Sequence, residues 1–166
     1  MQFSHWGTEP DSTGVSSEQL DRIVEASVHV PDGFAVHSRI KRFHIDARLR
    51  GYKDGSIDWA TAEALALGSL AIEGFNVRLI GEDTQRGTFS HRHAVFIDQN
   101  SDTPYTPLVE SPYMREQLRG RLEILNSNLA EAGPLAFEYG YSLESPKNLC
   151  LWEAQFGDFY NPAQVS

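Results

Sequence analysis

Residues 77–95 read VRLIGEDTQRGTFSHRHAV, in which an apolar tetrapeptide is followed directly by a long polar run. The apolar part, residues 77–80, is typical of a short buried strand. The polar part carries three carboxylate or amide side chains, two arginines and a His-Arg-His cluster, and it has no helical period. A run this polar between apolar segments indicates a functional site that begins where a strand ends.

The rest of the chain alternates expected strands with expected helices. Three further apolar runs indicate strands, at residues 94–97, 122–125 and 149–152. Helices are expected at residues 17–28, 40–52, about 58–73 and about 132–143. The third helix, between a capping Asp58 and Gly74, is apolar on nearly its whole circumference, which predicts burial. The charges of the basic helix at 40–52 are expected to face solvent. The alternation predicts an α/β fold, with a mostly parallel sheet flanked by helices.

Polar motifs begin at Gly81, Asn126 and Glu153, each at the end of an expected strand. The helix at 132–143 lies between the last two strands, as a crossover connection between parallel strands would. Because parallel sheets bind ligands at the carboxyl ends of their strands, these motifs are expected to share one site.

Composition limits the classes of function. The 166 residues carry a formal charge of −9, which argues against nonspecific binding to nucleic acid or to an anionic membrane surface. Cys150 is the only cysteine, so no internal disulfide can form, and a buried free thiol in a reducing, intracellular compartment is expected. The sequence shows no export signal and no apolar run long enough to span a bilayer.

Three segments together resemble a known family: residues 81–95, residues 126–141 (NSNLAEAGPLAFEYGY) and residues 152–164 (WEAQFGDFYNPAQ). The chain resembles the thiamin-diphosphate-dependent, decarboxylating component of the 2-oxoglutarate dehydrogenase complex. The resemblance implies a transketolase-like pyrimidine-binding domain at residues 56–166, incomplete at its C-terminus, after a linker or cut end at 1–16 and a helical lead-in at 17–55.

The resemblance also implies an activity. It is the oxidative decarboxylation of 2-oxoglutarate in the tricarboxylic acid cycle, with transfer of the succinyl group to lipoyl on a partner succinyltransferase. The implied cofactors are thiamin diphosphate and magnesium. The Gly-Asp-Gly motif that holds magnesium and the diphosphate in the family is absent from this sequence, so that half of the site is expected in another domain. A homodimer is expected from the family as well.

Particular residues match the family's cofactor site. Glu131 matches the glutamate that binds the aminopyrimidine ring nitrogen and activates the cofactor. Phe159 matches an aromatic residue that stacks on the pyrimidine, with Gln155 as polar support and Phe156 packing beside them. From the residues alone, Glu131 is equally well explained as a charge that stabilises a helix N-terminus, and the two phenylalanines as core residues.

The His-Arg-His cluster matches the family's substrate site. The resemblance places His93 against the substrate, with His91 and Ser90 beside it, where an imidazole stabilises charge or relays a proton. Two histidines at this spacing also suit zinc, but no further ligand follows at a recognised spacing, so no metal site is predicted. Arg86 and Arg92 are expected to pair with Glu82 and Asp83.

Several alternatives stay open at this point. They are a 2-oxoadipate dehydrogenase, a 2-oxoglutarate decarboxylase or 2-hydroxy-3-oxoadipate synthase, a noncatalytic interaction fragment, and a small metal-binding protein. The compartment is expected to be a bacterial cytoplasm, or a mitochondrial matrix if the source is eukaryotic.

Overall fold

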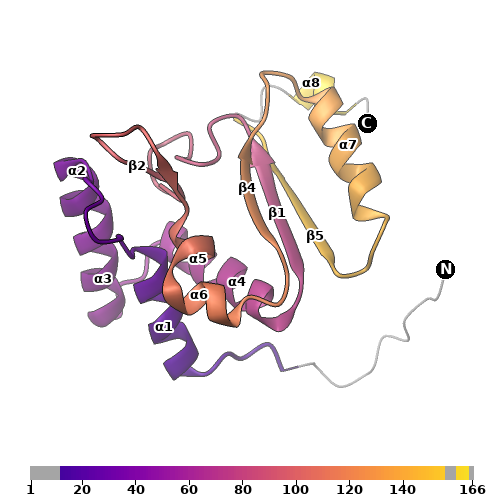
Figure 1. The fold of residues 1–166 in the computed structure, drawn as a ribbon. Coiled ribbons are helices and arrows are strands. Elements are labelled where there is room, and N and C mark those ends of the chain that lie inside the picture. The colour runs from indigo at the N-terminus through magenta and orange to yellow at the C-terminus, as the bar shows by residue number, and fades with distance from the viewer. Residues whose placement is uncertain (1–11, 156–159, 165–166) are drawn as a thin grey trace.

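The structure, a computed structural model, describes residues 12–155 and 160–164. Its centre is a three-stranded parallel sheet in the order β4-β1-β5 (Figure 1). The strands are β1 Asn76–Gly81, β4 Leu122–Asn126 and β5 Asn148–Glu153. Three of the four predicted strands, the parallel sheet and the α/β class are therefore confirmed.

The fourth predicted strand, at residues 94–97, does not belong to this sheet, so this prediction is wrong. Only β2 Phe96–Ile97 is extended, and it pairs antiparallel with β3 Pro104–Tyr105 in a separate two-stranded sheet. The cause lies in the preceding loop, where the Ala94 amide donates to the Gln85 carbonyl (2.7 Å) and so turns the chain away from the main sheet. Phe96 then packs in a second apolar cluster, with Val28, Ile45 and Tyr105.

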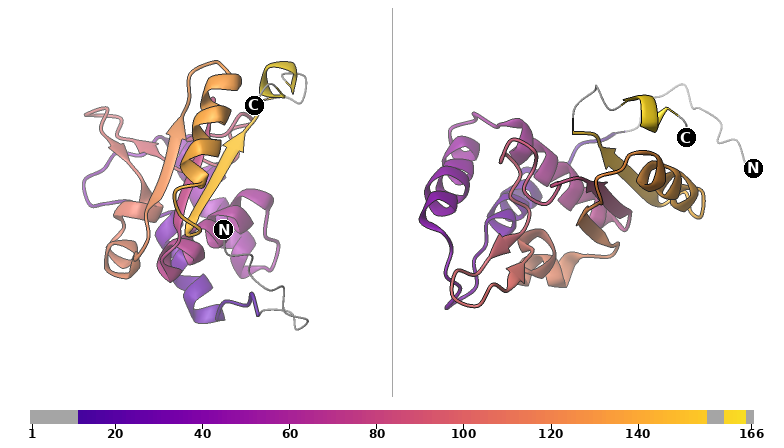
Figure 2. Two further views of the ribbon diagram at one scale, coloured as in Figure 1. Left: turned by 90° about the vertical axis from the view of Figure 1, so that its right-hand side faces the viewer. Right: turned by 90° about the horizontal axis from the view of Figure 1, so that it is seen from above.

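Two long helices cover one face of the sheet, α1 Ser17–Ser27 and α4 Trp59–Glu73 (Figure 2). The helix α4 begins after Asp58, the predicted cap, which accepts from the Thr61 amide, and α1 begins after Ser16, which accepts from the Gln19 amide. The second helix ends at Gly74, whose φ of 98° suits glycine. As predicted, most of α4 is buried. The core that it forms with α1 and the sheet includes Ile23, Ala64, Leu67, Ala71, Val77, Leu79, Leu122 and Ile124.

The predicted helix at residues 40–52 is present but irregular. It consists of α2 Ser38–Ile40, a π-helical turn at Lys41–Ile45 and α3 Asp46–Lys53. The expectation that its charges all face solvent is wrong for Arg48, which is buried. The Arg48 guanidinium donates to Ser27 Oγ (3.3 Å) and to the Arg92 carbonyl (3.4 Å), neutral acceptors that offset part of the cost of burial.

The other face of the sheet is covered by α7 Ala132–Ser142, the predicted crossover helix (Figure 2). Arg78 on β1 anchors it, because Nε lies 2.8 Å from the buried carboxylate of Glu138, and Nη1 lies 2.9 Å from Glu123 on β4. Cys150, opposite Arg78 in the register, is a free thiol that is half-buried rather than buried; burial raises its pKa.

Three short helices complete the described chain, α5 Pro107–Glu110, α6 Pro112–Gln117 and α8 Tyr160–Ala163. The first two were not predicted from the sequence. Each of them has a proline at its first position, where the missing N–H costs nothing. None of the helices in the described ranges combines the length and the apolar character that a membrane crossing requires.

Candidate functional site

The three parallel strands end side by side. Gly81 lies opposite Asn126 on one neighbour and opposite Glu153 on the other. The segments that follow are joined, because the Gln85 amide donates to Asn126 Oδ1 (2.9 Å). The prediction that the three polar motifs begin side by side at one edge of the sheet is therefore confirmed.

The loop from residue 82 to residue 95 is tightly folded. Four of its residues have φ between 41° and 82°, in the left-handed region: Asp83, Gly87, Ser90 and His93. The Arg86 carbonyl accepts both the Arg92 and the His93 amides, each at 3.0 Å. Non-glycine residues in this region of φ are uncommon and are often retained at ligand-binding sites, which is consistent with a functional role for the loop.

Arg92 fixes this loop to the rest of the molecule. Its Nε and Nη2 bind the carboxylate of Glu63 on α4 at 2.5 and 3.1 Å, and Nη2 also lies 2.6 Å from Glu153 at the end of β5. Nη1 donates to the Thr84 carbonyl (2.8 Å). Arg86 pairs with Asp83 as expected, but the expected pairing of Arg92 with Glu82 or Asp83 is wrong.

With Arg92 directed inward, the residues on either side of it line a pocket of about 700 Å³. Ser90, His91 and His93, the three predicted substrate-site residues, are among the residues that line this pocket. Burial lowers the pKa of His93, and the nearby Arg86 and Arg48 lower it further. Neutral imidazole is therefore favoured at His93, a form that can both donate and accept a hydrogen bond.

The rest of the lining comes mainly from the irregular helix, which the sequence did not connect with the site. His44, in the π-helical turn, lies with its ring centroid 5.2 Å from that of His93 in an edge-on arrangement. Arg48 and Asp58 line the same pocket. The basic sequence of residues 40–52 gave no indication that Arg48 and His44 are buried. The π-helical turn, a feature frequent at functional sites, appears only in the structure.

Burial lowers the pKa of His44 from 6.5 to about 3, and repulsion from the Arg48 guanidinium and from His93 when it is protonated adds to the effect. The pKa of His44 is lower in the folded chain than in the unfolded chain, so between these two pKa values the unfolded chain binds more protons. The free energy of unfolding therefore falls as the pH falls through this range. At pH 5 we expect this histidine to cost about 2 kcal/mol relative to pH 7.

Urea denaturation of wild type and His44→Gln at pH 7 and pH 5 measures this effect. The variant is expected to lose less stability than wild type on acidification. His37→Gln, which replaces an exposed histidine of the same pocket, is the control and should behave as wild type does. Equal acid sensitivity of His44→Gln and wild type would contradict the assignment.

Glu131 is placed where the sequence analysis expects it, as the N-cap residue of α7. It is half-buried and lines a small hollow of about 10 Å³ with Glu82, Trp152, Glu153 and others at the strand ends. Within the described parts of the chain, nothing donates a hydrogen bond to its carboxylate. The side chain is therefore not used as a helix cap, although the sequence allowed that interpretation.

Gln155 lies in the same hollow and is held at both ends. Its Nε2 donates to the Glu82 carbonyl (2.7 Å), and its Oε1 accepts from Thr88 Oγ1 (3.0 Å). It thus links the end of β5 to the His-Arg-His loop. Phe156 and Phe159, the predicted aromatic residues of the cofactor site, lie outside the described residues.

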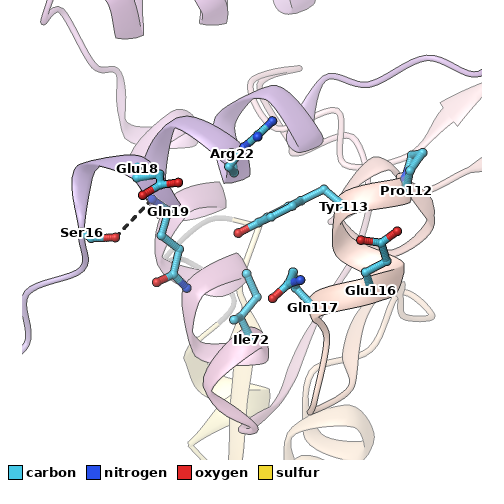
Figure 3. A pocket seen from close by; sticks show the side chains of 9 residues that line it. All are labelled: Ser16, Glu18, Gln19, Arg22, Ile72, Pro112, Tyr113, Glu116 and Gln117. Carbon is cyan, nitrogen blue, oxygen red and sulfur yellow. Dashed lines mark hydrogen bonds between the residues drawn. The ribbon is translucent and has the colours of Figure 1, made fainter.

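A hollow of about 720 Å³ also occurs elsewhere on the molecule, between α1, α4 and α6 (Figure 3). It lies near Ile72, at the end of α4 that leads into the amino end of β1, and thus away from the strand carboxyl ends. Across residues 12–155 and 160–164, no group of three His, Cys, Asp or Glu side chains is arranged to hold a metal ion.

The fold agrees with comparisons to known proteins. The family described as "Transketolase, pyrimidine binding domain" matches residues 55–166. The chain belongs to this pyrimidine-binding domain family. Its relatives include the 2-oxoadipate dehydrogenase complex component E1 of Homo sapiens (52% identical over 93% of this chain) and the mitochondrial 2-oxoglutarate dehydrogenase of Dictyostelium discoideum (48% over 94%). The Dictyostelium discoideum probable 2-oxoadipate dehydrogenase complex component E1 homolog is 51% identical over 93%.

The chain spans only 16–17% of the length of these relatives. The residues present fit one part of a pyrimidine site. Glu131 offers an unpaired, half-buried carboxyl group at the strand ends, and a carboxyl group suits a ring nitrogen. The hollow beside it, about 10 Å³, is smaller than a pyrimidine ring, so the described residues alone do not enclose one.

Proposed function

We propose that this domain supplies the pyrimidine half of the active site of a thiamin-diphosphate-dependent 2-oxo acid dehydrogenase that acts on a dicarboxylic 2-oxo acid, 2-oxoglutarate or 2-oxoadipate. The observation that carries the proposal is Glu131, whose carboxyl group has no partner among the described residues. An ionisable group without a structural partner at the ligand-binding edge of a parallel sheet is a candidate for catalysis.

In this proposal Glu131 holds a proton at the pyrimidine ring nitrogen, while Phe159 stacks on the ring with Phe156 packed beside it. The bound cofactor supplies the carbanion chemistry that decarboxylation requires. Gln155 keeps the end of β5 attached to the loop of the histidines through its contacts with Glu82 and Thr88. This attachment fixes the separation between the cofactor side of the site and the substrate side.

His93 is proposed to act on the substrate side, with His91 and Ser90. It lines the pocket of about 700 Å³, and burial keeps its imidazole neutral. A neutral imidazole can donate to the developing negative charge of the substrate or pass a proton to it. The lowered pKa thus keeps both roles available at neutral pH.

The remaining parts of the proposal concern the larger protein that the relatives represent. Magnesium is held by another domain, the protein forms a homodimer, and the acyl group passes to lipoyl on an acyltransferase. The activity of 2-oxoglutarate dehydrogenase belongs to the tricarboxylic acid cycle. Relatives named for 2-oxoadipate and for 2-oxoglutarate are similar to this chain in nearly the same degree, so both substrates are tested.

The test is a chimeric enzyme, in which this chain replaces the 155 matched residues of the human 2-oxoadipate dehydrogenase complex component E1. With thiamin diphosphate and magnesium, we expect carbon dioxide release from 2-oxoadipate or 2-oxoglutarate. A correctly folded chimera that releases none from either acid would count against the catalytic proposal and favour a noncatalytic interaction domain.

A further inference from the structure

His91 lies between two hollows of the molecule. It lines the pocket of about 700 Å³ that His93 also lines, and it lines a second hollow of about 360 Å³. Among the described residues, it is the only one that lines both. Trp152 and Glu153 line the second hollow and also the small hollow beside Glu131. The ring of His91 therefore stands between the pocket of His93 and the end of the site that carries Glu131.

This ring occupies the space that a side chain at residue 87 would fill. A Cβ atom placed on Gly87 would lie 2.5 Å from Nδ1 of the His91 ring and 3.1 Å from Nε2, and Cε1 would be nearer still. Non-bonded carbon atoms pack at about 3.5–4.0 Å, so a side chain at residue 87 and the ring cannot share this space. Because an imidazole is rigid, it can give way only by moving as a whole.

The backbone of Gly87 is held in place. Gly87 is buried, its amide donates to the Asp83 carbonyl (2.7 Å), and its carbonyl accepts from the Ser90 amide (2.9 Å). Its φ of 82° lies in the left-handed region, which glycine adopts without strain. A conflict between a side chain at residue 87 and the His91 ring would therefore be relieved by movement of the ring rather than of the backbone.

Hydrogen bonding at Nδ1 does not hold the His91 ring where it is. This nitrogen is buried and has no hydrogen-bond partner among the described residues. The Phe89 ring lies beside the imidazole, with the centroids 6.3 Å apart, but the Phe89 side chain is itself 75% exposed. The place of the ring thus depends on packing, and the surface against which Nδ1 packs is the backbone of Gly87.

We propose that Gly87 is the positioning residue for His91, and that the absence of a side chain at residue 87 keeps the imidazole between the two hollows. The inference rests on the proposed function, in which His91 acts on the substrate side with His93. A side chain at residue 87 would displace the His91 ring from the large pocket and so remove one of its contacts with the substrate.

The first test is urea denaturation of Gly87→Ala, made in the wild-type chain and in His91→Ala. Gly55→Ala is the matched control, since Gly55 has a φ of 71° but a Cβ atom placed on it meets nothing within 4 Å. It measures the cost of alanine in the left-handed region alone. We expect Gly87→Ala to lower the urea midpoint more than Gly55→Ala does, and the excess to disappear in His91→Ala. No excess, or an excess that persists there, would overturn the proposal.

The second test is NMR of the histidine ring protons, which a purely structural role of Gly87 would not move. In folded Gly87→Ala we expect the signal of His91 to shift, while that of His29, which binds Tyr105, stays in place. An unchanged His91 signal contradicts the positioning role. If Gly87→Ala does not fold, the double variant with His91→Ala decides. A folded double variant supports the inference, and a double variant that stays unfolded while His91→Ala folds overturns it.

In the chimeric enzyme, Gly87→Ala is expected to raise the KM of the 2-oxo acid about tenfold, the loss of one hydrogen bond to a charged group, while Gly55→Ala leaves it unchanged. The first two tests need neither substrate nor turnover. An inactive chimera whose chain shows the coupling between residues 87 and 91 would therefore count against the proposed function and leave the positioning by Gly87 in place. An active chimera whose chain shows no coupling would do the reverse.

Discussion

Glu131→Gln is expected to lower the turnover of the chimeric enzyme by about 10² to 10⁴, the usual contribution of a positioned general acid or base. Glutamine preserves the size of the side chain but cannot carry the proton that the ring nitrogen needs. Since no described residue donates to the Glu131 carboxylate, the loss should appear in kcat without a comparable loss of stability.

The control for this prediction is Glu144→Gln, an exposed glutamate just beyond the other end of α7. Loss of the negative charge at the N-terminus of α7 costs at most about 1 kcal/mol through the helix dipole, which thermal denaturation of both variants measures. Turnover and melting temperature that fall together in Glu131→Gln would indicate a structural role and contradict the catalytic one.

The position of Glu131 could be predicted from the sequence because the signals involved are local. A short apolar run, a polar segment and a helix follow one another from residue 122 to residue 142, and the rule for parallel sheets places their junction at the ligand-binding edge. The same rule located Gly81 and Glu153 beside it. The loop bearing His93 was predicted to be a site on composition alone, and in the structure this loop contributes to the lining of a pocket of about 700 Å³.

The partners of buried charges were not predictable in this way. Arg92 is bound by Glu63 and Glu153, one far before it and one far after it in the chain, and no spacing rule connects them. The sequence suggested the adjacent Glu82 and Asp83, which are nearer along the chain but not in space. The burial of Arg48 was not predicted for a related reason. The π-helical turn before it changes which side of the helix is buried, and a prediction from regular helical periodicity assumes that no such turn occurs.

Arg92→Met is expected to lower the free energy of unfolding by about 3–5 kcal/mol, the usual cost of removing one partner from a buried ion pair. The side chain of Arg92 is 7% exposed, and those of Glu63 and Glu153 are 20% and 22% exposed, so the variant leaves two poorly solvated carboxylates close together. Urea denaturation at neutral pH measures the loss. Arg86→Met removes a pair whose side chains are about half exposed and should cost less than about 1 kcal/mol.

The double variant Arg92→Met with Glu63→Gln separates the cost of the stranded carboxylates from the cost of lost packing. Because Glu63→Gln removes one of the two repelling charges, the double variant should be less destabilised than the sum of the single variants. Arg92 also holds the backbone on which His91 and His93 are placed, through its bond to the Thr84 carbonyl and the ion pair with Glu153. In the chimera, the single variant should therefore weaken binding of the dicarboxylic substrate even at temperatures where the protein stays folded. Additive losses, or an unchanged KM in folded Arg92→Met, would show that this ion-pair network supports the fold alone and does not position the histidines.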